Sequence, residues 1–286
     1  MNDRPRSVTI FTHRRTAQTA PAIATVVRLA AESGAEVRVP AEEAEKHDVE
    51  PREGVRVVSD LGEPTDLVIA LGGDGTILGA LRTYAGTGTP VFAVNYGTIG
   101  FLATVEPDEL EDGIRHALAG GFDVMRLPVL VADTEQGEQI AVNDISFHRR
   151  QNGRVAELAY SVDNWDLGEV RCDGLVVASA AGSTGYNLAN GGPVMAWGVE
   201  GFVVSFIAPH TLTARSLVVA PDDVLRVTNR SRDEDVDLTA DGRTTCAVAP
   251  GATVPIHLRR DSALLAQPLG ATFYSRLRDK FGRLSF

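Results

Sequence analysis

The sequence predicts an α/β doubly wound domain followed by an all-β, sandwich-like domain, and three observations lead to this expectation. Strand-like and helix-like segments alternate through roughly the first 125 residues. Within them, the segment 67–71 (LVIAL) is a continuous apolar run, which is typical of a strand buried on both faces of a parallel sheet. After Leu127-Pro128, short β-rich runs separated by turn residues dominate, and helical spacing becomes scarce.

In the first part, apolar spacing and flanking residues define each expected element. The helix expected after the first strand has apolar residues at helical spacing and is followed by Gly34, a typical helix terminator. A charged stretch at 42–53 is expected to be a solvated loop or helix face. The expected strands are 8–11, 36–39, 67–71 and 91–94, and the expected helices are 16–33, 77–84 and 109–119.

In the second part, a helix is expected after Gly182, and the tail at 271–286 returns to a helical pattern. Phe273, Leu277 and Phe281 share one face of that tail, and we expect this face to pack back on the first domain. The expected strands are 129–132, 140–147, 158–162, 175–178, 202–207, 217–219, 224–228, 236–239 and 253–258. The expected domains are an α/β nucleotide-binding domain at 1–126, a β-rich domain at 127–265 and a C-terminal segment at 266–286.

Composition and charge argue against several classes of protein. The 286 residues are 44% hydrophobic and 23% charged, which are ordinary values for a globular protein. The net charge of −11 argues against nucleic-acid binding, which requires a basic face. Cys172 and Cys246 fit no zinc or disulfide pattern, no apolar run approaches the roughly 20 residues of a membrane span, and no signal peptide is apparent. We therefore expect a soluble, cytoplasmic protein with no membrane or nucleic-acid partner.

Lysine is scarce in this chain, and its positions restrict how phosphate could be bound. The two lysines, Lys46 and Lys280, do not follow glycine-rich loops, so the GxxxxGK[ST] phosphate loop and the kinase VAIK strand are absent from the sequence. If the protein handles nucleotide phosphates, backbone amides, arginines and Mg²⁺ must bind them.

The strongest local motif is the segment 72–76, GGDGT, which directly follows the LVIAL run and precedes a helical segment. Gly72, Gly73 and Gly75 let a ligand approach the backbone closely, and amides at a strand-to-helix turn, with Thr76 beside them, suit a phosphate. A carboxylate at Asp74 would repel phosphate, so it is expected to face an acceptor hydroxyl or a metal-bound phosphate. The alternative interpretation is an Asp-Gly hairpin turn, which the flanking strand and helix disfavour.

Two further segments are candidates for the same site. The segment 95–102, NYGTIGFL, places a second glycine-rich loop at the carboxyl end of the neighbouring strand, where open α/β sheets bind ligands. Asn143 and Asp144 interrupt an apolar strand; asparagine can pair with an adenine edge, and a carboxylate can accept hydrogen bonds from ribose hydroxyls. A tight connection and a bulge, respectively, remain the alternatives for these two segments.

A group of small and polar residues in the second part could line a ligand. Arg171-Cys172-Asp173-Gly174 precedes a strand, and the segment 182–187 (GSTGYN) follows it, with Gly-Gly-Pro at 191–193 shortly after. Thr184, Tyr186 and Asn187 offer hydrogen bonds and a stacking face. His210 and the segment 241–243 (DGR) are weaker features that could be ordinary loops. The sequence contains no HExxH, catalytic-triad elbow or metal-cluster spacing, and it assigns no protein ligand to a metal.

Taken together and in this order, GGDGT, NYGTIGFL, VNDIS, RCDGLVVASAAGSTGYN, GGP, APHTL and ADGR resemble the NAD kinase family. The resemblance runs from about Leu67 to Arg243. It implies an N-terminal α/β domain, a C-terminal β domain and a ligand cleft between them. The implied activity is transfer of the γ-phosphate of ATP, or of polyphosphate in some members, to the 2′-hydroxyl of the adenosine ribose of NAD. It also implies a homodimer or homotetramer.

The resemblance also implies roles for individual residues. Asp74 matches the proton acceptor, with Gly75 beside it on the ligand, and Mg²⁺ or another divalent cation accompanies ATP. Asn143 and Asp144 match the pair that holds adenosine, and Arg171 and Asp173 lie where the family contacts the nicotinamide half. The remaining NAD-binding positions are Thr184, Gly185, Tyr186, Asn187, Leu188, Ala189, Ala208 and Arg243.

This chain departs from the family pattern at several positions. Asp144 replaces the usual glutamate, which shortens the carboxylate by one methylene. Ala180-Ala181 replaces the usual Pro-Thr and removes a hydroxyl, and Gly185 replaces an alanine. Gly79 stands where a basic residue is common, and Arg82, one turn further, could substitute for it. These changes bear on the choice between NAD and NADH more than on phosphoryl transfer.

The mechanism expected from these residues is in-line phosphoryl transfer. The glycine loop positions the ATP phosphates, and Asp74 orients the ribose hydroxyl and accepts its proton late, as the new O–P bond forms. Two alternatives are a lipid kinase of the diacylglycerol or sphingosine type, which shares GGDGT, and a non-catalytic NAD(H)-binding sensor. The charge of −11 and the lack of a membrane-binding helix pattern count against the lipid kinase.

Overall fold

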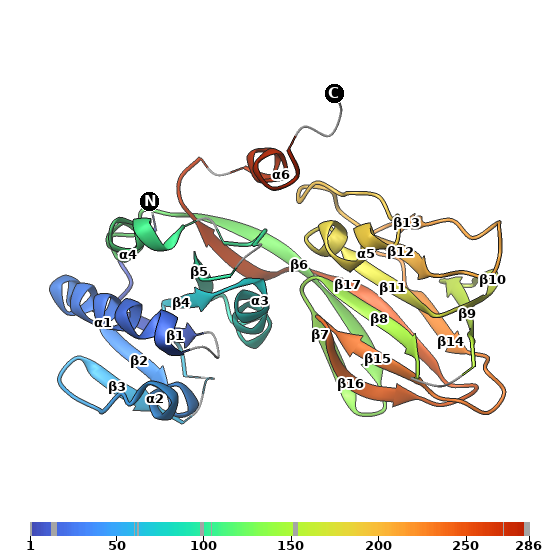
Figure 1. Ribbon diagram of the computed structural model, residues 1–286, viewed down its shortest axis with the longest axis horizontal. Coiled ribbons are helices and arrows are strands. Elements are labelled where there is room, and N and C mark those ends of the chain that lie inside the picture. Colours follow the sequence, from blue (N-terminus) through green and yellow to red (C-terminus); the bar gives the residue numbers. More distant parts are fainter. Residues whose placement is uncertain are drawn as a thin grey trace. The chain divides into compact units, whose positions relative to one another are not determined.

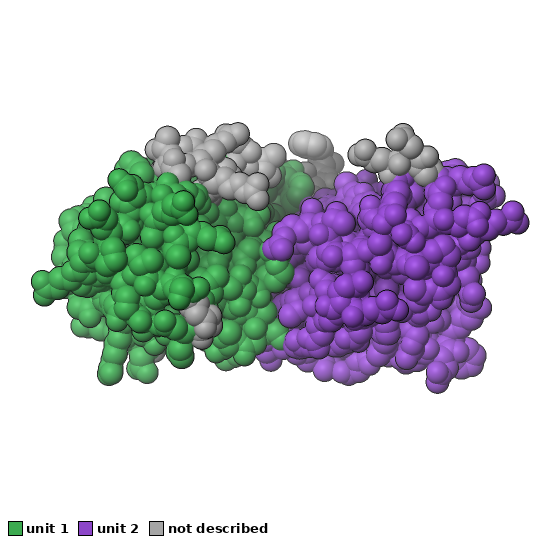
Figure 2. Space-filling model, turned by 90° about the horizontal axis from the view of Figure 1, so that it is seen from below, with its two compact units in different colours: residues 1–126, 262–286 green, residues 127–261 purple. Residues whose placement is uncertain are grey.

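The computed structural model describes residues 2–12, 16–59, 61, 63–97, 100–103, 105–150, 154–270 and 272–282. The chain divides into two compact units (Figure 2). Unit 1 comprises Met1–Arg126 together with Ser262–Phe286, and unit 2 comprises Leu127–Asp261. None of the helices in the described ranges is long and apolar enough to cross a membrane.

Unit 1 is built around a parallel sheet in which β5, β4, β1, β2 and β3 lie side by side in that order (Figure 1). Its central strand β4 is buried at every residue, as its uninterrupted apolar sequence predicts. The elements of unit 1 are β1 (Ser7–Thr12), α1 (Thr16–Ser33), β2 (Glu36–Pro40), α2 (Ala41–His47), β3 (Val55–Val58), β4 (Leu67–Gly72), α3 (Asp74–Thr83), β5 (Pro90–Asn95), the 3₁₀ helix η1 (Pro107–Glu109), α4 (Leu110–Leu118) and α6 (Phe273–Phe281).

Helices cover both faces of this sheet, which is why its strand β4 is apolar throughout. Leu67, Ile69 and Leu71 of β4 belong to one core with apolar residues of α1 and α4. Val68 and Ala70, which point to the opposite face, are fully buried as well, and α3 packs against β4 and β5. The parallel arrangement brings the carboxyl ends of β4 and β5 to the same edge.

Helix α3 begins three residues earlier than its predicted start at Ile77. Asp74 is its first residue, and Gly73, in an extended conformation, precedes it as the N-cap. A carboxylate in the first turn is favoured by the partial positive charge at a helix N-terminus, so the aspartate belongs to the helix and not to the loop before it.

Unit 2 is a sandwich of antiparallel strands. One sheet has the order β13-β12-β11-β8-β15-β16, and β10, β9, β14 and β17 form the facing layer. Apolar side chains from both layers share one core, including Phe147, Leu175, Leu158 and Leu225. The elements are β6 (Asp123–Thr134), β7 (Gly137–Ala141), β8 (Asp144–Arg149), β9 (Ala156–Val162), β10 (Trp165–Cys172), β11 (Gly174–Ser179), η2 (Gly182–Thr184), α5 (Tyr186–Ala189), β12 (Phe202–Ile207), β13 (Leu217–Val219), β14 (Leu225–Asn229), β15 (Val236–Ala240), β16 (Arg243–Val248) and β17 (Thr253–Gln267).

The α/β class followed by a β-rich part is confirmed, but several predicted elements are wrong in detail. The strand predicted at 140–147 is two strands, β7 and β8, separated at Val142 and Asn143, where the backbone turns to bond other groups. Strand β17 extends nine residues beyond its predicted end at Leu258 and pairs in parallel with β5. Strands β3, β10 and β16 were not predicted; most of β10 is exposed, so it lacks the alternation that marks a half-buried strand.

The C-terminal helix α6 belongs to unit 1. Thr272 caps it, because the Thr272 hydroxyl accepts a hydrogen bond from the Ser275 amide and the Ser275 hydroxyl accepts one from the Thr272 amide. Phe273 and Leu277, two of the predicted apolar residues, are buried, whereas Phe281 is about half-exposed. Of the predicted tail, residues 271 and 283–286 lie outside the described ranges.

Candidate active site

The GGDGT turn of unit 1 packs against the second glycine loop. Gly72 ends β4 opposite Asn95, the last residue of β5. A Cβ atom at Gly97 would lie 2.8 Å from the Cα atom of Gly73, and one at Gly72 would lie 2.4 Å from the Thr76 hydroxyl. Glycine is therefore required for this close approach. Gly75 is exposed on the first turn of α3, whereas Thr98 and Ile99 of the predicted motif lie outside the described residues.

Asp74 is fixed by the backbone of the turn that follows this second loop. Its Oδ2 atom accepts a hydrogen bond from the Phe101 amide (2.8 Å), and its Oδ1 atom accepts one from the Leu102 amide (3.2 Å). Burial raises the pKa of the Asp74 carboxyl, whereas these two amides and the positive charges of Lys280 and Arg276 act in the opposite direction. The carboxylate is thus held in one orientation at the N-terminus of α3.

In unit 2, the predicted pair Asn143-Asp144 lies on a turn whose amides are bound by Asp241. One Asp241 oxygen accepts from the Asn143 amide (2.8 Å) and the Asp144 amide (3.3 Å), and the other accepts from the Val142 amide (3.1 Å). The Asp241 amide donates in return to the Asp144 carbonyl (2.9 Å). The segment 241–243 gives only a weak signal in the sequence, an aspartate before a glycine. Aspartate tolerates the positive φ of 48° found at Asp241.

The opposite side of this turn packs on the segment after β11. The Ser179 amide donates to the Asn143 carbonyl (2.9 Å), and the Ser179 hydroxyl donates to the Val142 carbonyl (2.6 Å). A Cβ atom at Gly182 would lie 2.0 Å from the Asn143 carbonyl oxygen, so glycine is required there. The turn is therefore held from both sides.

The two side chains of the pair are left available for a ligand. Asp144 is buried, and this burial together with the neighbouring Asp241 carboxylate raises its pKa to about 7. The Asn143 Oδ1 atom is buried without a hydrogen-bond partner among the described residues. A buried acceptor of this kind is costly unless a bound group donates to it. An exocyclic amine of a base would satisfy it.

The predicted segment from Thr184 to Ala189 contains both exposed and structural residues. Tyr186 is partly exposed and stacks on His148, with ring centroids 5.7 Å apart and an interplanar angle of 14°. Gly185 and Ala189 are exposed, and Thr184 and Leu188 are half-buried. These residues form one small surface next to the end of β11.

Asn187 differs from the others in this segment because it is fully buried. Its side-chain amide donates to the carbonyls of Ser183 and Pro193, both at 2.9 Å. A Cβ atom at Gly192 would lie 1.8 Å from the Asn187 Oδ1 atom. The side-chain amide of Asn187 therefore fastens the loop at 191–193, and the assignment of Asn187 to NAD binding stays a prediction.

The remaining predicted residues fall into two places in unit 2. Arg171 is exposed and pairs with Glu157 (3.2 Å), and Asp173 pairs with Arg149 (2.6 Å). The loop containing Ala208 lies beside them, because the amide of His210 donates to the Arg171 carbonyl (2.7 Å). Arg243 is exposed at the start of β16, next to the turn of Asp241.

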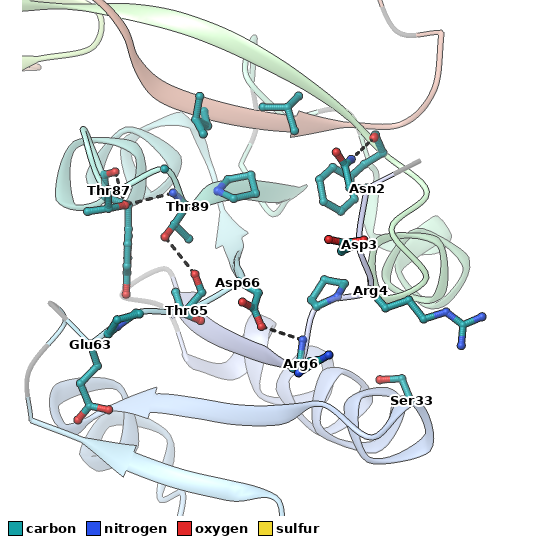
Figure 3. Close-up of a pocket in the computed structure, with 18 of the residues that line it drawn as sticks. Asn2, Asp3, Arg4, Arg6, Ser33, Glu63, Thr65, Asp66, Thr87 and Thr89 are labelled. Atoms are coloured by element: carbon teal, nitrogen blue, oxygen red, sulfur yellow. Dashed lines mark hydrogen bonds between the residues drawn. The ribbon is translucent and has the colours of Figure 1, made fainter.

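A cavity of about 1030 Å³ lies elsewhere in unit 1 (Figure 3). Arg6, Asp66 and Thr89, which precede β1, β4 and β5, line it, so it opens at the amino edge of the sheet. Asp74 follows the other end of β4, and none of the predicted site residues lines this cavity. In Figure 3, Asp66 accepts a hydrogen bond from the Arg6 amide (2.8 Å).

In the part of the chain that the structure describes, few side chains that could bind a metal ion lie close together. No three His, Cys, Asp or Glu side chains gather there. Mg²⁺ prefers several water and phosphate oxygens with one or two carboxylates. The expectation that Mg²⁺ accompanies ATP stays a prediction.

A glycine-lined strand-to-helix turn with a fixed carboxylate, and a β-rich unit with a buried amide acceptor and a buried carboxyl, together define a nucleotide-dependent phosphotransferase. Comparisons with known proteins identify its family. The ATP-NAD kinase N-terminal domain matches residues 4–122, and the ATP-NAD kinase C-terminal domain matches residues 142–268. The chain belongs to the NAD kinase family, whose enzymes phosphorylate NAD to NADP with ATP.

Individual relatives agree with this assignment. The NAD kinase of Gemmatimonas aurantiaca is 35% identical over 238 residues, which cover 80% of this chain and 81% of that protein. An NAD kinase of Pseudomonas putida is 35% identical over 229 residues, which cover 78% of this chain and 77% of that protein. The resemblance inferred from the motifs is confirmed.

Two solved structures share the fold. The crystal structure of yeast NADH kinase complexed with NADH has a TM-score of 0.88 at 23% identity, covering 100% of this chain and 90% of that one. The crystal structure of an NAD kinase from Archaeoglobus fulgidus in complex with ATP has a TM-score of 0.73 at 24% identity, covering 96% and 97%. The α/β class followed by a β-rich part is thus the fold of known NAD kinases.

Proposed function

We propose that this chain transfers the γ-phosphate of ATP to the 2′-hydroxyl of the adenosine ribose of NAD, with Asp74 as the proton acceptor. The observation that carries this proposal is the fixed Asp74 carboxylate at the N-terminus of α3, held by the Phe101 and Leu102 amides. A lipid kinase or an NAD(H) sensor has no comparable support, because the family matches cover both parts of the chain.

The turn at 72–76 supplies the phosphate-binding part of the mechanism. The backbone amides at the start of α3 bind the donor phosphates, aided by the positive end of the helix dipole. Asp74 orients the ribose hydroxyl toward the terminal phosphorus by accepting its hydrogen bond. An ordinary aspartate has a pKa of about 3.9 and is a weak base for a free alcohol, so the proton moves late, when the O–P bond is largely formed. Orientation supplies most of the rate.

The turn at 142–144 supplies the recognition of adenosine. The Asn143 Oδ1 atom accepts a hydrogen bond from the exocyclic amine of adenine, and the Asp144 carboxylate accepts from a ribose hydroxyl. Tyr186 and its neighbours Thr184, Gly185, Leu188 and Ala189 line the dinucleotide. Asn187 acts from behind them by holding their loop in place.

A second group of residues in unit 2, around Arg171 and Asp173, is assigned to the nicotinamide half of NAD. Arg171 and Asp173 contact it, with Ala208 beside them, whereas Arg243 contacts the dinucleotide near the Asp241 turn. Both ion pairs found there, Arg171 with Glu157 and Asp173 with Arg149, are partly exposed and can exchange partners at little cost.

The proposal extends to the state of the protein in the cell. We assign it to the cytoplasm, because both cysteines are free thiols, as a reducing compartment requires. We also propose a homodimer or homotetramer. Strand β10 ends the order of its sheet and exposes Trp165 (78%) and Leu167 (41%), and an unpaired edge with exposed apolar side chains favours pairing with a second copy.

An acceptor and donor matrix tests the proposed function. The purified chain would be incubated with NAD or NADH and with ATP or polyphosphate, each in the presence of Mg²⁺, and the 2′-phosphorylated product would be measured. Formation of NADP from NAD and ATP is expected. Binding of NAD by calorimetry with no transfer from either donor would favour the sensor, and phosphorylation of diacylglycerol or sphingosine without NADP formation would favour the lipid kinase.

A further inference from the structure

Helix α6 reaches the turn that holds Asp74. Arg276 of α6 is 7% exposed, and its Nη1 atom donates to the carbonyl oxygens of Phe101 and Leu102, both at 2.9 Å. These carbonyls lie more than 170 positions earlier in the chain. In Figure 1, α6 is the red helix that precedes the C-terminus.

Arg276 and Asp74 bind the same two residues from opposite sides. Asp74 accepts hydrogen bonds from the amides of Phe101 and Leu102, and Arg276 donates to the carbonyls of these residues. Both polar backbone groups of each residue are therefore committed to one of the two side chains. A shift of the turn would change the orientation of Asp74 and the contacts of Arg276 at once.

Aromatic packing strengthens the same contact. The ring of Phe101 lies between two rings of α6, with centroid distances of 5.9 Å to Phe273 and 6.1 Å to Phe281. The capping box at Thr272 and Ser275 fixes where the helix begins, and hence where Arg276 emerges. The helix thus holds the turn through both its polar backbone and its ring.

We propose that Arg276 is a positioning residue for phosphoryl transfer: by holding the carbonyls of Phe101 and Leu102 it fixes the amides that orient Asp74. This inference rests on the proposed function, in which Asp74 accepts the proton of the ribose hydroxyl. Arg276 does not itself contact the substrate in this scheme. Its effect is expected in the rate of the chemical step and not in the affinity for NAD.

The charge of Arg276 has a second effect on Asp74. Burial lowers the pKa of the Arg276 guanidinium to about 10, so the group remains protonated at neutral pH. The charged groups that lower the pKa of Asp74 are Lys280 and Arg276, both on α6. Removal of either charge is therefore expected to raise the pKa of Asp74 and to move the acidic limb of the pH–rate profile to higher pH.

Four variants of the full chain separate the two effects. Arg276→Gln removes the charge and most of the hold on the turn, Arg276→Lys keeps the charge with a different donor geometry, and Lys280→Gln removes only a neighbouring charge. Arg278→Gln is the matched control, because Arg278 is exposed on the same helix and pairs with the adjacent Asp279. The measurements are kcat, the dissociation constant of NAD by calorimetry, the pH–rate profile and thermal stability.

The expected results differ between the variants. Arg276→Gln lowers kcat about 10- to 100-fold, as misplacement of a reacting group does, with the NAD dissociation constant within about twofold of the parent. Its acidic limb moves to higher pH. Arg276→Lys lowers kcat less than Arg276→Gln does and leaves the acidic limb at its parental pH. Lys280→Gln moves the acidic limb to higher pH and retains most of the parental kcat. If Arg276 had only a structural role, Arg276→Gln would lower thermal stability. The acidic limb of the pH–rate profile, measured on the protein that remains folded, would then not move.

Amide hydrogen exchange tests the inference without any activity measurement. Exchange at Phe101 and Leu102 is expected to accelerate in Arg276→Gln and to stay at the parental rate in Lys280→Gln and Arg278→Gln. If the parent fails to phosphorylate NAD, the proposed function is wrong, and the exchange rates still decide whether Arg276 holds the turn. Parental exchange in Arg276→Gln, or a kcat and acidic limb equal to those of Arg278→Gln, would overturn the inference.

Discussion

Each unit of the molecule contains a turn whose backbone amides are bound by an aspartate, and the two turns use that aspartate differently. In unit 1, Asp74 binds the amides of Phe101 and Leu102 and is itself the group proposed to act on the substrate. In unit 2, Asp241 binds the amides of the turn at 142–144, and the adjacent Asp144 is the group proposed to meet the ligand.

Burial raises the pKa of both carboxyls, but the groups around Asp74 and Asp144 act on it in opposite directions. Amides and two cations oppose the burial of Asp74, whereas a second carboxylate adds to the burial of Asp144 and brings its pKa to about 7. A carboxylate that binds amides directly is favoured in its charged form, and one that sits beside such a carboxylate is disfavoured. Asp74 is therefore suited to a role in one fixed orientation, whereas Asp144 can change its protonation near neutral pH.

Removal of the Asp74 carboxylate should give the largest effect. Asp74→Asn is expected to lower kcat by roughly 100-fold or more, because the asparagine cannot accept the proton and keeps only one oxygen for the amides of Phe101 and Leu102. NAD affinity is expected to stay largely intact. Steady-state kinetics and calorimetry measure the two quantities. Asp66→Asn is the matched control, because Asp66 also binds backbone amides but lies before the amino end of β4. Near-normal turnover in Asp74→Asn would remove Asp74 from the mechanism.

A change at Asp241 should weaken binding and spare the chemical step. Asp241→Asn replaces one of the two oxygens that bind the turn with a donor, so the loss of bonded amides is expected to cost about 1–3 kcal/mol of unfolding free energy. If the same hydrogen bonds are lost in the NAD complex, the NAD dissociation constant should rise about tenfold. The kcat value should change less. A fall in kcat at unchanged NAD affinity would contradict this assignment.

The protonation of Asp144 should make NAD affinity depend on pH. Ribose hydroxyls donate to the charged carboxylate, so NAD should bind about tenfold more tightly at pH 8 than at pH 6, as Asp144 ionises around its pKa of about 7. Calorimetry at several pH values measures this change. Asp144→Asn should bind NAD with little pH dependence, and a parental slope in that variant would assign the titration to another group.

The same raised pKa has a consequence for stability with a definite sign. Because the folded pKa of Asp144 lies above the ordinary value of 3.8, its contribution to stability is complete below that value and is lost as pH rises through about 7. The loss is on the order of 4 kcal/mol for this buried group. Denaturant unfolding of the parent and of Asp144→Asn from about pH 4 to about pH 8 should show the parent losing stability relative to the variant, because the asparagine side chain does not ionise.

Two glycines contrast the two regions sterically, and the smallest effect is expected at Gly79. Gly79 lies inside α3 with no atom within 4 Å of the position of a Cβ atom, so Gly79→Ala should stabilise the chain by about 0.5–1 kcal/mol. Gly182→Ala should instead destabilise it by about 1–3 kcal/mol, because its Cβ atom would overlap the Asn143 carbonyl. Thermal unfolding measures both changes. A stabilised Gly182→Ala would mean that the turn at 142–144 is not held as described.

The sequence predicted those parts of the site that depend on local pattern. A buried strand followed by GGDGT indicated the Asp74 turn, and polar residues within an apolar run indicated Asn143 and Asp144. Arg276 and Asp241 were not predicted as supports, because each binds backbone groups far away in the sequence, and backbone groups leave no mark on the identity of the residues that carry them. Strand β10 was not predicted for a related reason, since an edge strand exposed on both faces has no alternation to detect.

Unit 1 is assembled from two segments of the chain, with unit 2 encoded between them. During synthesis on the ribosome, the strands of unit 2 up to the start of β17 emerge first. The end of β17 and helix α6, which belong to unit 1, are synthesised after them. If Arg276 sets the orientation of Asp74, a nascent chain would not reach its full turnover until helix α6 docks, long after its GGDGT turn has been translated. Ordering of the β-rich unit would then precede the onset of turnover.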